Sequence, residues 1–343
     1  KQCEKSVLQN TLKDLSIAYT KFFKGSMKYT DKTLQKAKRI GKHLTLYDLD
    51  KHPKFKSYKN NYQSCKVNFT KTTAGGNIRI EEKEIKHTST GKYRKQFCKI
   101  KLPKIKQVRI AYSRQYQGRI VSSTISRDTD NKYYISLCCI DIPQENKEKT
   151  GAVIGIDLGI KEFATTSDNT IINNPKYYRK YEKKLIKIQQ CLSRRKIGSN
   201  NRNKQRLKVN KYHKKIYHCR IDFLQKLSTK LINDYDIICM EDLNVSGMLQ
   251  NHKLAKSISD VSFYEFNREL EYKSRWSDKI YQQVDRYYPS SQICSECGNQ
   301  SRQTKDLGHR TYIYEKCGLI IDRDYNASIN ILNEGLRILQ EAS

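Results

Sequence analysis

Short apolar segments alternate with long polar segments from Gly151 onwards, and this alternation constrains the fold more than any other feature. Short apolar runs between turn residues are typical of buried strands. The sequence predicts such strands at Ala152–Ile156, Ile237–Met240 and 279–285. The segments between and after them predict helices at 175–196, 201–233, 261–276 and 326–340. Strands that alternate with helices predict an α/β layer architecture for 151–343.

The first half of the chain has a different pattern. Residues 6–24 and 31–40 have the apolar spacing of amphipathic helices, and each segment ends at a glycine. Between about 64 and 142, short segments rich in strand-forming residues are separated by glycines and polar turns. This pattern predicts a small β-barrel or sandwich. The charged segment Pro143–Thr150 predicts a domain boundary.

The charge of the chain indicates a polyanionic partner. Lys and Arg number 67 against 35 Asp and Glu, which gives a formal net charge of +32. Nucleic acid is the expected partner, because neutralising phosphates releases counterions. The basic residues run through the whole chain, and no run of 18 apolar residues occurs, so we expect no membrane partner. The eleven cysteines are odd in number and lie mostly in apolar stretches, which predicts a reducing, cytoplasmic environment.

One segment concentrates this charge. Residues 176–215 contain sixteen Lys or Arg and one acid, Glu182. Like charges at helical spacing repel one another, and a bound phosphate backbone would remove that cost. The alternative is a solvated helix face, and the interleaved tyrosines either stack on bases or pack the helices. The candidate nucleic-acid contacts in this segment are Arg194, Arg195, Lys196, Arg202, Lys204 and Arg206.

Three acidic residues follow strands or precede a helix. Asp157 follows the first buried strand, Glu241 closes the second, and Asp324 precedes the last helix. Each alone is more often a cap or a turn residue. A ribonuclease-H-like sheet, however, places acids at the ends of its first and fourth strands and at the start of a late helix. Such acids can hold two divalent ions about 3.5–4 Å apart, and Mg²⁺ prefers oxygen ligands.

These residues resemble a known family. The segments that resemble the three RuvC motifs of the TnpB family are Gly155-Ile156-Asp157-Leu158-Gly159, Met240-Glu241-Asp242-Leu243-Asn244-Val245 and Asp322-Arg323-Asp324-Tyr325-Asn326-Ala327. TnpB proteins are transposon-encoded, RNA-guided endonucleases related to the type V CRISPR effectors. Further matches are Tyr288-Pro289-Ser290-Ser291-Gln292-Ile293-Cys294, Ser193-Arg194-Arg195-Lys196 and Pro53-Lys54-Phe55-Lys56.

The resemblance implies a function and a set of site residues. Asp157, Glu241 and Asp324 would be catalytic and would hold Mg²⁺ or Mn²⁺, while Asp322 would support the turn. Guide RNA and target DNA would be the partners, and Lys54 and Lys56 would join the nucleic-acid contacts. A prokaryotic host would place the protein at the nucleoid.

The resemblance also implies a division into five parts. They are a helical recognition remnant at 1–45, a β-barrel wedge domain at 46–145, a RuvC-like nuclease domain with the basic hairpin at 151–289, a zinc-ribbon-like insert at 290–318 and the rest of the nuclease domain at 319–343.

The cysteine insert departs from the family pattern. Cys294 and Cys297 have the spacing of the first half of a zinc ribbon. The family carries a second pair, whereas this chain has Tyr314 before Cys317. His309 or a water could complete the zinc site, and the alternative is a weakened or empty site. Because zinc binding contributes folding energy in such modules, a missing ligand should matter.

Three interpretations remain open. The leading one is an RNA-guided DNA endonuclease that hydrolyses phosphodiester bonds with two metal ions. The second is a catalytically weak or inactive DNA- or RNA-binding remnant of a transposon protein. It is favoured by the lost cysteine and by a chain that starts at Lys1, before which we expect missing sequence. The intact acidic triad opposes it. A basic RNA-binding protein of ribosomal type would not need the three acids.

Overall fold

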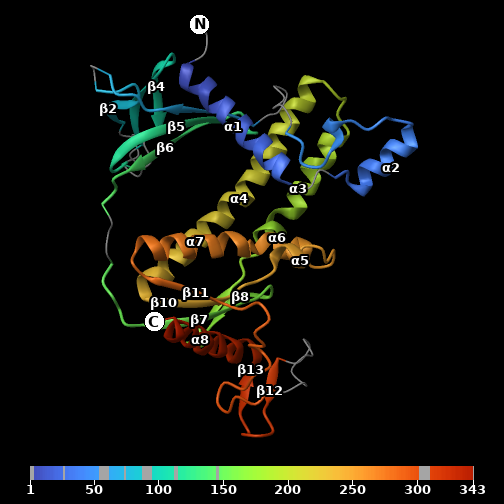
Figure 1. Ribbon diagram of the computed structural model, residues 1–343, viewed down its shortest axis with the longest axis vertical. Coiled ribbons are helices and arrows are strands. Elements are labelled where there is room, and N and C mark those ends of the chain that lie inside the picture. The colour runs from blue at the N-terminus through green and yellow to red at the C-terminus, as the bar shows by residue number, and fades with distance from the viewer. Residues whose placement is uncertain are drawn as a thin grey trace. The chain divides into compact units, whose positions relative to one another are not determined.

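The computed structural model describes residues 4–25, 28–53, 62–72, 75–86, 95–111, 115–143, 147–300 and 310–342 (Figure 1). The chain divides into two compact units, Lys1–Pro143 and Gln144–Ser343. Both combine helices with sheets, so the predicted α/β class is confirmed. Among the described helices, none has the length and hydropathy that a membrane crossing needs.

The first unit packs two small sheets face to face. Its helical elements are α1 (Lys5–Lys24), α2 (Asp31–Ile40) and the 3₁₀ turn η1 (Leu46–Asp48). Its strands are β1 (Gln63–Asn68), β2 (Arg79–Lys86), β3 (Lys95–Leu102), β4 (Lys106–Ala111), β5 (Arg119–Arg127) and β6 (Tyr133–Ile140). The antiparallel sheets β1-β5-β6 and β2-β3-β4 share one core, to which Val67, Ile100 and Ile120 contribute. The described strands do not close into a barrel, because no ladder joins the two sheets, so they form the sandwich alternative.

The second unit is built on a mixed five-stranded sheet. Its strands are β7 (Val153–Leu158), β8 (Glu162–Thr166), β9 (Ile171–Asn173), β10 (Ile237–Glu241) and β11 (Ile280–Val284), in the order β11-β10-β7-β8-β9. The strands β11, β10 and β7 are parallel, whereas β8 and β9 run antiparallel to their neighbours. The three predicted strands are confirmed, and the β8–β9 hairpin was not predicted.

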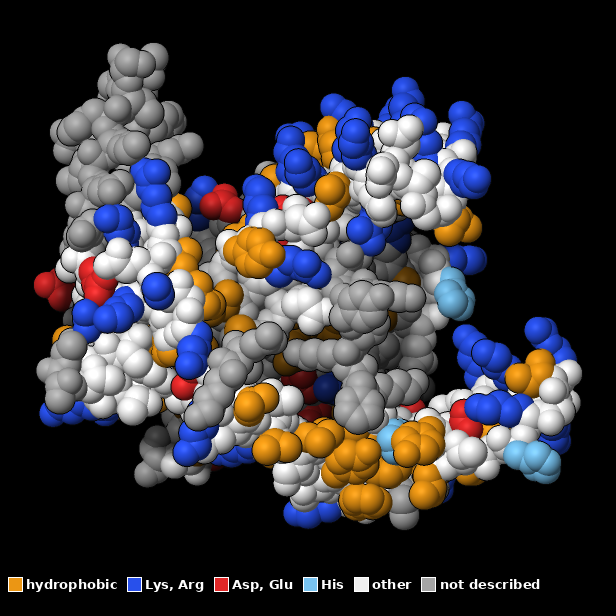
Figure 2. All heavy atoms as spheres, turned by 90° about the horizontal axis from the view of Figure 1, so that it is seen from above, with side chains coloured by type: hydrophobic (Ala, Val, Ile, Leu, Met, Phe, Trp, Pro, Cys, Tyr) orange, Lys and Arg blue, Asp and Glu red, His pale blue; other side chains and the backbone are white. Residues whose placement is uncertain are grey.

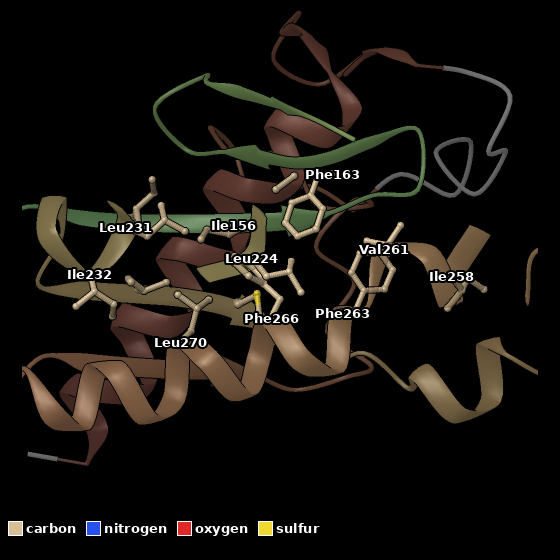
Figure 3. Close-up of a cluster of buried hydrophobic side chains, with 14 residues drawn as sticks. Ile156, Phe163, Leu224, Leu231, Ile232, Ile258, Val261, Phe263, Phe266 and Leu270 are labelled. Atoms are coloured by element: carbon tan, nitrogen blue, oxygen red, sulfur yellow. The ribbon is translucent and has the colours of Figure 1, made fainter. Parts of the chain in front are cut away.

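Helices cover both faces of this sheet. The helices of this unit are α3 (Tyr177–Ser193), α4 (Asn200–Asp234), α5 (Val245–Met248), α6 (Ala255–Val261), α7 (Phe263–Trp276) and α8 (Arg323–Glu341), of which α3 packs on α4 and not on the sheet. Alternate strand residues such as Ile154, Ile156 and Ile238 enter the large core with α4, α6 and α7. Figure 3 shows part of this core, including Ile156, lying between the sheet and α7.

The opposite face of the sheet packs so closely on α8 that two contact positions have room only for glycine. A Cβ atom at Gly155 in β7 would lie 2.2 Å from the Ser328 carbonyl oxygen of α8, so only glycine fits there. A Cβ at Gly335 in α8 would lie 2.4 Å from Cys239 Sγ in β10. Because strand side chains alternate between faces, the residues two positions after Gly155 and Cys239 also point to the α8 side. Those residues are Asp157 and Glu241.

The cysteine insert forms a small ribbon before α8. The strands β12 (Thr311–Ile313) and β13 (Ile320–Asp322) pair antiparallel, and Ile293 bridges Gln300. Buried Cys294, Tyr312 and Tyr314 form the ribbon core. In Figure 1, β12 and β13 lie beside α8.

The predicted basic hairpin is formed by α3 and α4. Leu185, Val209 and Ile216 are buried between the two helices. The partly buried tyrosines packed around them are Tyr177, Tyr178, Tyr181 and Tyr212. These four therefore pack the hairpin, as in the packing alternative, whereas Tyr217 is 54% exposed.

Candidate functional site

The parallel pairing of β7 and β10 brings two of the predicted acids to the same edge of the sheet. Met240 pairs with Ile156, so Glu241 and Asp157 are the next residues on adjacent strands. Parallel strands end at the same edge, and both side chains point to the face that α8 covers. Each acid keeps part of its surface accessible.

The first turn of α8 supplies the third acid. Asp322 is the N-cap of α8, and its carboxylate accepts hydrogen bonds from the backbone N–H groups of Asp324 (2.9 Å) and Tyr325 (3.1 Å). The predicted supporting role of Asp322 is therefore confirmed. Asp324 lies at the positive end of the helix dipole, which favours a carboxylate there.

The three predicted acids line one cleft of about 760 Å³. The cleft also exposes basic groups from several elements, including Lys161, Lys176, Arg179, Lys256, Arg286, Arg310 and Arg323. A phosphate chain and the cations that accompany it would find partners of both signs in such a cleft. The oxygen atoms of these three carboxylates do not all lie within 4.8 Å of one another. Among the described residues, only the sulfur atoms of the ribbon cysteines form a group of three possible metal ligands that close.

The carboxylates affect one another electrostatically. Burial raises the pKa of Asp157 well above its ordinary value, and the carboxylates of Asp324 and Glu241 raise it further. Burial, and then the neighbouring Asp242, raise the pKa of Glu241 to about 7. Acids that destabilise one another's charge in this way fit a site that takes up divalent cations, because a cation removes the repulsion.

Two arginines that sequence reasoning missed line this cleft, and each is paired with an acidic group. Arg310 Nη1 lies 2.6 Å from Asp324 Oδ2, and Arg286 Nη2 lies 2.5 Å from Asp242 Oδ2. Arg310 belongs to the ribbon, and its backbone carbonyl accepts a hydrogen bond from the Arg323 N–H. No local sequence signal pairs Arg310 with Asp324, because the contact depends on how the ribbon folds back onto α8.

The three predicted cysteine ligands cluster in the ribbon. The Sγ atoms of Cys294, Cys297 and Cys317 lie within 4.8 Å of one another, and Cys294 Sγ is 3.5 Å from Cys317 Sγ. Tyr314 is 1% exposed and donates its hydroxyl hydrogen to the Ile293 carbonyl at 3.2 Å. Three thiolates fit a zinc ion in part, since a structural zinc site has four ligands. His309 lies outside the described residues.

The predicted nucleic-acid contacts in the hairpin differ in their surroundings. Arg194, Arg195, Lys196 and Lys204 are exposed. Arg202 is partly buried, and its Nη1 donates to the carbonyls of Leu192 (2.8 Å) and Arg195 (3.0 Å), so it closes the hairpin loop. Arg206 Nε is buried and has no partner among the described residues.

The charge imbalance extends beyond the hairpin. Figure 2 shows many Lys and Arg side chains and few Asp and Glu on the face of the molecule that it presents. Lys54 and Lys56 lie outside the described residues.

Two sequence-family models match the second unit and the end of the first. The OrfB_IS605 family, described as "Probable transposase", matches residues 136–252. The Cas12f1-like TNB domain matches residues 263–331. The two matches together contain Asp157, Glu241, Asp324 and the ribbon cysteines.

Several curated proteins are similar in sequence. A Streptomyces pristinaespiralis protein named "Putative RNA-guided DNA endonuclease" is 41% identical over 213 residues, covering 62% of this chain and 52% of that protein. The Escherichia coli K12 protein InsQ, which has the same description, is 30% identical over 256 residues, covering 70% of this chain and 63% of InsQ. The mimivirus "TnpB-like protein L770" is 29% identical over 308 residues, covering 81% of this chain and 55% of that protein.

The chain thus spans between half and two thirds of the length of these relatives. The relatives, the transposase match and the three motifs in their order along the chain agree with one another. By sequence, the chain is related to the TnpB family.

Proposed function

We propose that this chain is an RNA-guided DNA endonuclease of a transposable element, with a RuvC-like nuclease domain. The names of the relatives support the activity. The observation that carries the proposal is that Asp157, Glu241 and Asp324, from three distant segments, line one cleft. The strand arrangement supports a ribonuclease-H-like domain, since the acids lie on the first and fourth strands of the unit and on the first turn of α8.

Asp157, Glu241 and Asp324 would hold Mg²⁺ or Mn²⁺ in this cleft. When bound, such ions stabilise charge on the attacking and leaving oxygens of a phosphodiester. The protein itself supplies the orientation. Asp322 fixes the first turn of α8, and the β7–β10 pairing fixes the other two acids. The basic groups that line the cleft attract and position the phosphate backbone.

Guide RNA would bind mainly through basic surfaces. The exposed residues Arg194, Arg195, Lys196 and Lys204 at the hairpin are the proposed phosphate contacts, together with Lys54 and Lys56. In this scheme base pairing reads the target sequence, and the protein reads backbone shape and a short flanking motif. The proposed division of labour assigns scaffold binding to the wedge region 46–145, cleavage to 151–289 and 319–343, and a supporting role to the ribbon 290–318.

One observation favours a second candidate, a nucleic-acid-binding remnant with little or no cleavage. Tyr314 stands at a ribbon position where the resemblance implies a cysteine, which is the kind of change expected in a decaying enzyme. The three acids and their common cleft argue against it.

The test is cleavage by the purified protein with its copurifying RNA. The RNA is sequenced, guide-complementary DNA is supplied as single and double strands, and Mg²⁺ is added. We expect cleavage in Mg²⁺ and none after chelation, with single strands cut more readily because they need no duplex opening. If the loaded protein binds both targets and cuts neither, the binding-only candidate is the better account.

A further inference from the structure

The two halves of the ribbon share one backbone geometry. The Cys294 carbonyl accepts a hydrogen bond from the Gly298 N–H at 3.0 Å, and the Tyr314 carbonyl accepts one from the Gly318 N–H at 2.7 Å. Both glycines have the left-handed φ that such a turn requires, 68° and 73°. Tyr314 therefore occupies, in the second turn, the position that Cys294 occupies in the first.

The Tyr314 side chain joins the two turns by hydrogen bonds. Its hydroxyl donates to the Ile293 carbonyl at 3.2 Å and accepts from Asn326 Nδ2 at 3.1 Å. The ring lies in the ribbon core and is 1% exposed. In a four-cysteine ribbon, a metal ion connects the two turns. Here the Tyr314 side chain, in the second turn, reaches Ile293, the residue immediately before the first turn.

Two buried asparagines of α8 fix the first turn from the other side. Asn326 and Asn330 are 0% and 3% exposed, and both donate Nδ2 hydrogens to the Ile293 carbonyl, at 2.7 and 2.6 Å. Asn326 Oδ1 also accepts from the Ser295 N–H at 3.0 Å, and Asn330 donates to the Ser290 carbonyl at 2.7 Å. Because buried polar groups are costly when unpaired, these hydrogen bonds hold the 290–295 segment on α8.

The three thiols remain together beside this network. Cys294 is buried, Cys297 is intermediate and Cys317 is exposed, so the cluster opens to solvent on one side. Three thiolates suit a thiophilic divalent cation such as Zn²⁺, but they leave one position of a tetrahedral ion to be filled from solvent.

We propose that the Tyr314–Ile293–Asn326 hydrogen bonds replace the structural metal of this ribbon. The ribbon folds without zinc, and Cys294, Cys297 and Cys317 form an open three-thiolate site that takes up Zn²⁺ reversibly. Zinc is then a ligand of the folded ribbon and not a condition of its folding. This inference does not depend on the proposed function, because it is tested without any cleavage assay.

Zinc affinity tests the site. Zn²⁺ is competed against a chromophoric chelator with the full chain as wild type, Tyr314→Cys, Cys317→Ser and His309→Ala. We expect Tyr314→Cys to bind Zn²⁺ about tenfold more tightly or better, since even outer-shell changes alter affinity 10–100-fold. Cys317→Ser should abolish binding, and His309→Ala should leave it unchanged. A loss in His309→Ala as large as in Cys317→Ser would overturn the open site and make His309 the fourth ligand.

Hydrogen exchange of residues 294–300 and 310–318 tests whether the ribbon folds without metal. After chelation, the wild-type protein should keep its protection from exchange. The Tyr314→Cys variant should lose protection and regain it with Zn²⁺, because it lacks the phenol hydrogen bonds and has a fourth zinc ligand instead. Tyr314→Phe should lose protection without metal, and the control Tyr287→Phe, at a side chain that is 85% exposed, should not. If chelation removes protection from wild type as fully as from Tyr314→Cys, the hydrogen bonds do not replace the metal.

Discussion

Burial and neighbouring acids raise the pKa of Asp157, and these surroundings determine what a substitution there should do. Replacing Asp157 with Asn keeps the shape and removes one of the repelling charges. We expect cleavage to fall about 100-fold or more, because bound metal ions contribute several kcal/mol and about 1.4 kcal/mol is tenfold in rate. The thermal midpoint should be equal or higher, since a buried repulsion is relieved. Cleavage rate and thermal unfolding are measured on the same preparation.

The matched control is Glu162→Gln. Glu162 lines the same cleft from β8 but lies outside the acidic triad. We expect this variant to retain cleavage within a few-fold of wild type and RNA binding at wild-type affinity. Equal loss in Asp157→Asn and Glu162→Gln would mean that the cleft needs negative charge in general and not a particular triad.

For single residues, the sequence predicted those whose role is indicated by their immediate neighbours in the chain. Asp157, Glu241 and Asp324 could be selected because each adjoins a recognisable strand end or helix start. Arg310 could not, because it meets Asp324 only through the ribbon. Arg202 was predicted as a phosphate contact from charge alone, although its guanidinium is also bonded to two loop carbonyls. Its contact with phosphate stays a prediction.

At the scale of secondary-structure elements, the Asp236 carboxylate connects the starts of three strands, at the end of the sheet opposite the acids. Asp236 precedes β10, accepts hydrogen bonds from the Gly151 N–H at 2.6 Å and the Thr150 hydroxyl at 3.3 Å, and lies 3.2 Å from Lys279 Nζ before β11. It therefore ties together the starts of β7, β10 and β11. The hydrogen bonds at Thr150 and Gly151 and the Lys279 ammonium lower the pKa of Asp236 to about 2.

This shift gives a signed pH prediction. A carboxyl whose pKa is lowered by folding stabilises the fold above its unfolded pKa, about 3.9, and loses that contribution as pH falls towards 2. We expect Asp236→Asn to lower the denaturation midpoint at pH 5 to 7, and the difference from wild type to shrink between about pH 4 and 2. Asp234→Asn, two residues earlier, is the control and should show no such pH-dependent difference. A constant difference across the range would contradict the assignment.

The elements that sequence predicted best were those with a clear period or a clean apolar run. The long helices α4 and α7 and the strands β7 and β10 belong to this group. The β8–β9 hairpin was missed because its residues 162–173 mix Thr, Asn and Asp with few apolar residues, so neither strand alternates clearly. The barrel was not found because closure depends on pairing between distant strand edges, which local pattern does not determine.

For the molecule as a whole, the net charge of +32 predicts strongly salt-dependent RNA binding. Replacing Arg194, Arg195 and Lys196 with Ala removes three exposed cations from the hairpin loop. We expect lower affinity and a plot of log K against log [salt] that is shallower by about 2, since each phosphate contact to single-stranded RNA contributes about 0.7. Filter binding over a salt series measures both quantities.

The control removes the same number of cations that already have carboxylate partners. Arg268, Arg275 and Arg337 are paired with Glu265, Glu271 and Glu334. Replacing these three with Ala should leave the slope nearly unchanged, because paired cations release few counterions from RNA. If both triple variants reduce the slope equally, the hairpin is only one part of a general electrostatic attraction.

The order of the acids along the chain has a consequence for synthesis. Asp157 and the α3–α4 hairpin precede β10, and Asp324 comes later still, in the first turn of α8. The basic hairpin is therefore synthesised before Glu241 and Asp324, and Asp324 is the last of the three acids to be made. If the proposed function holds, the growing chain can bind guide RNA through the hairpin before its catalytic site is complete.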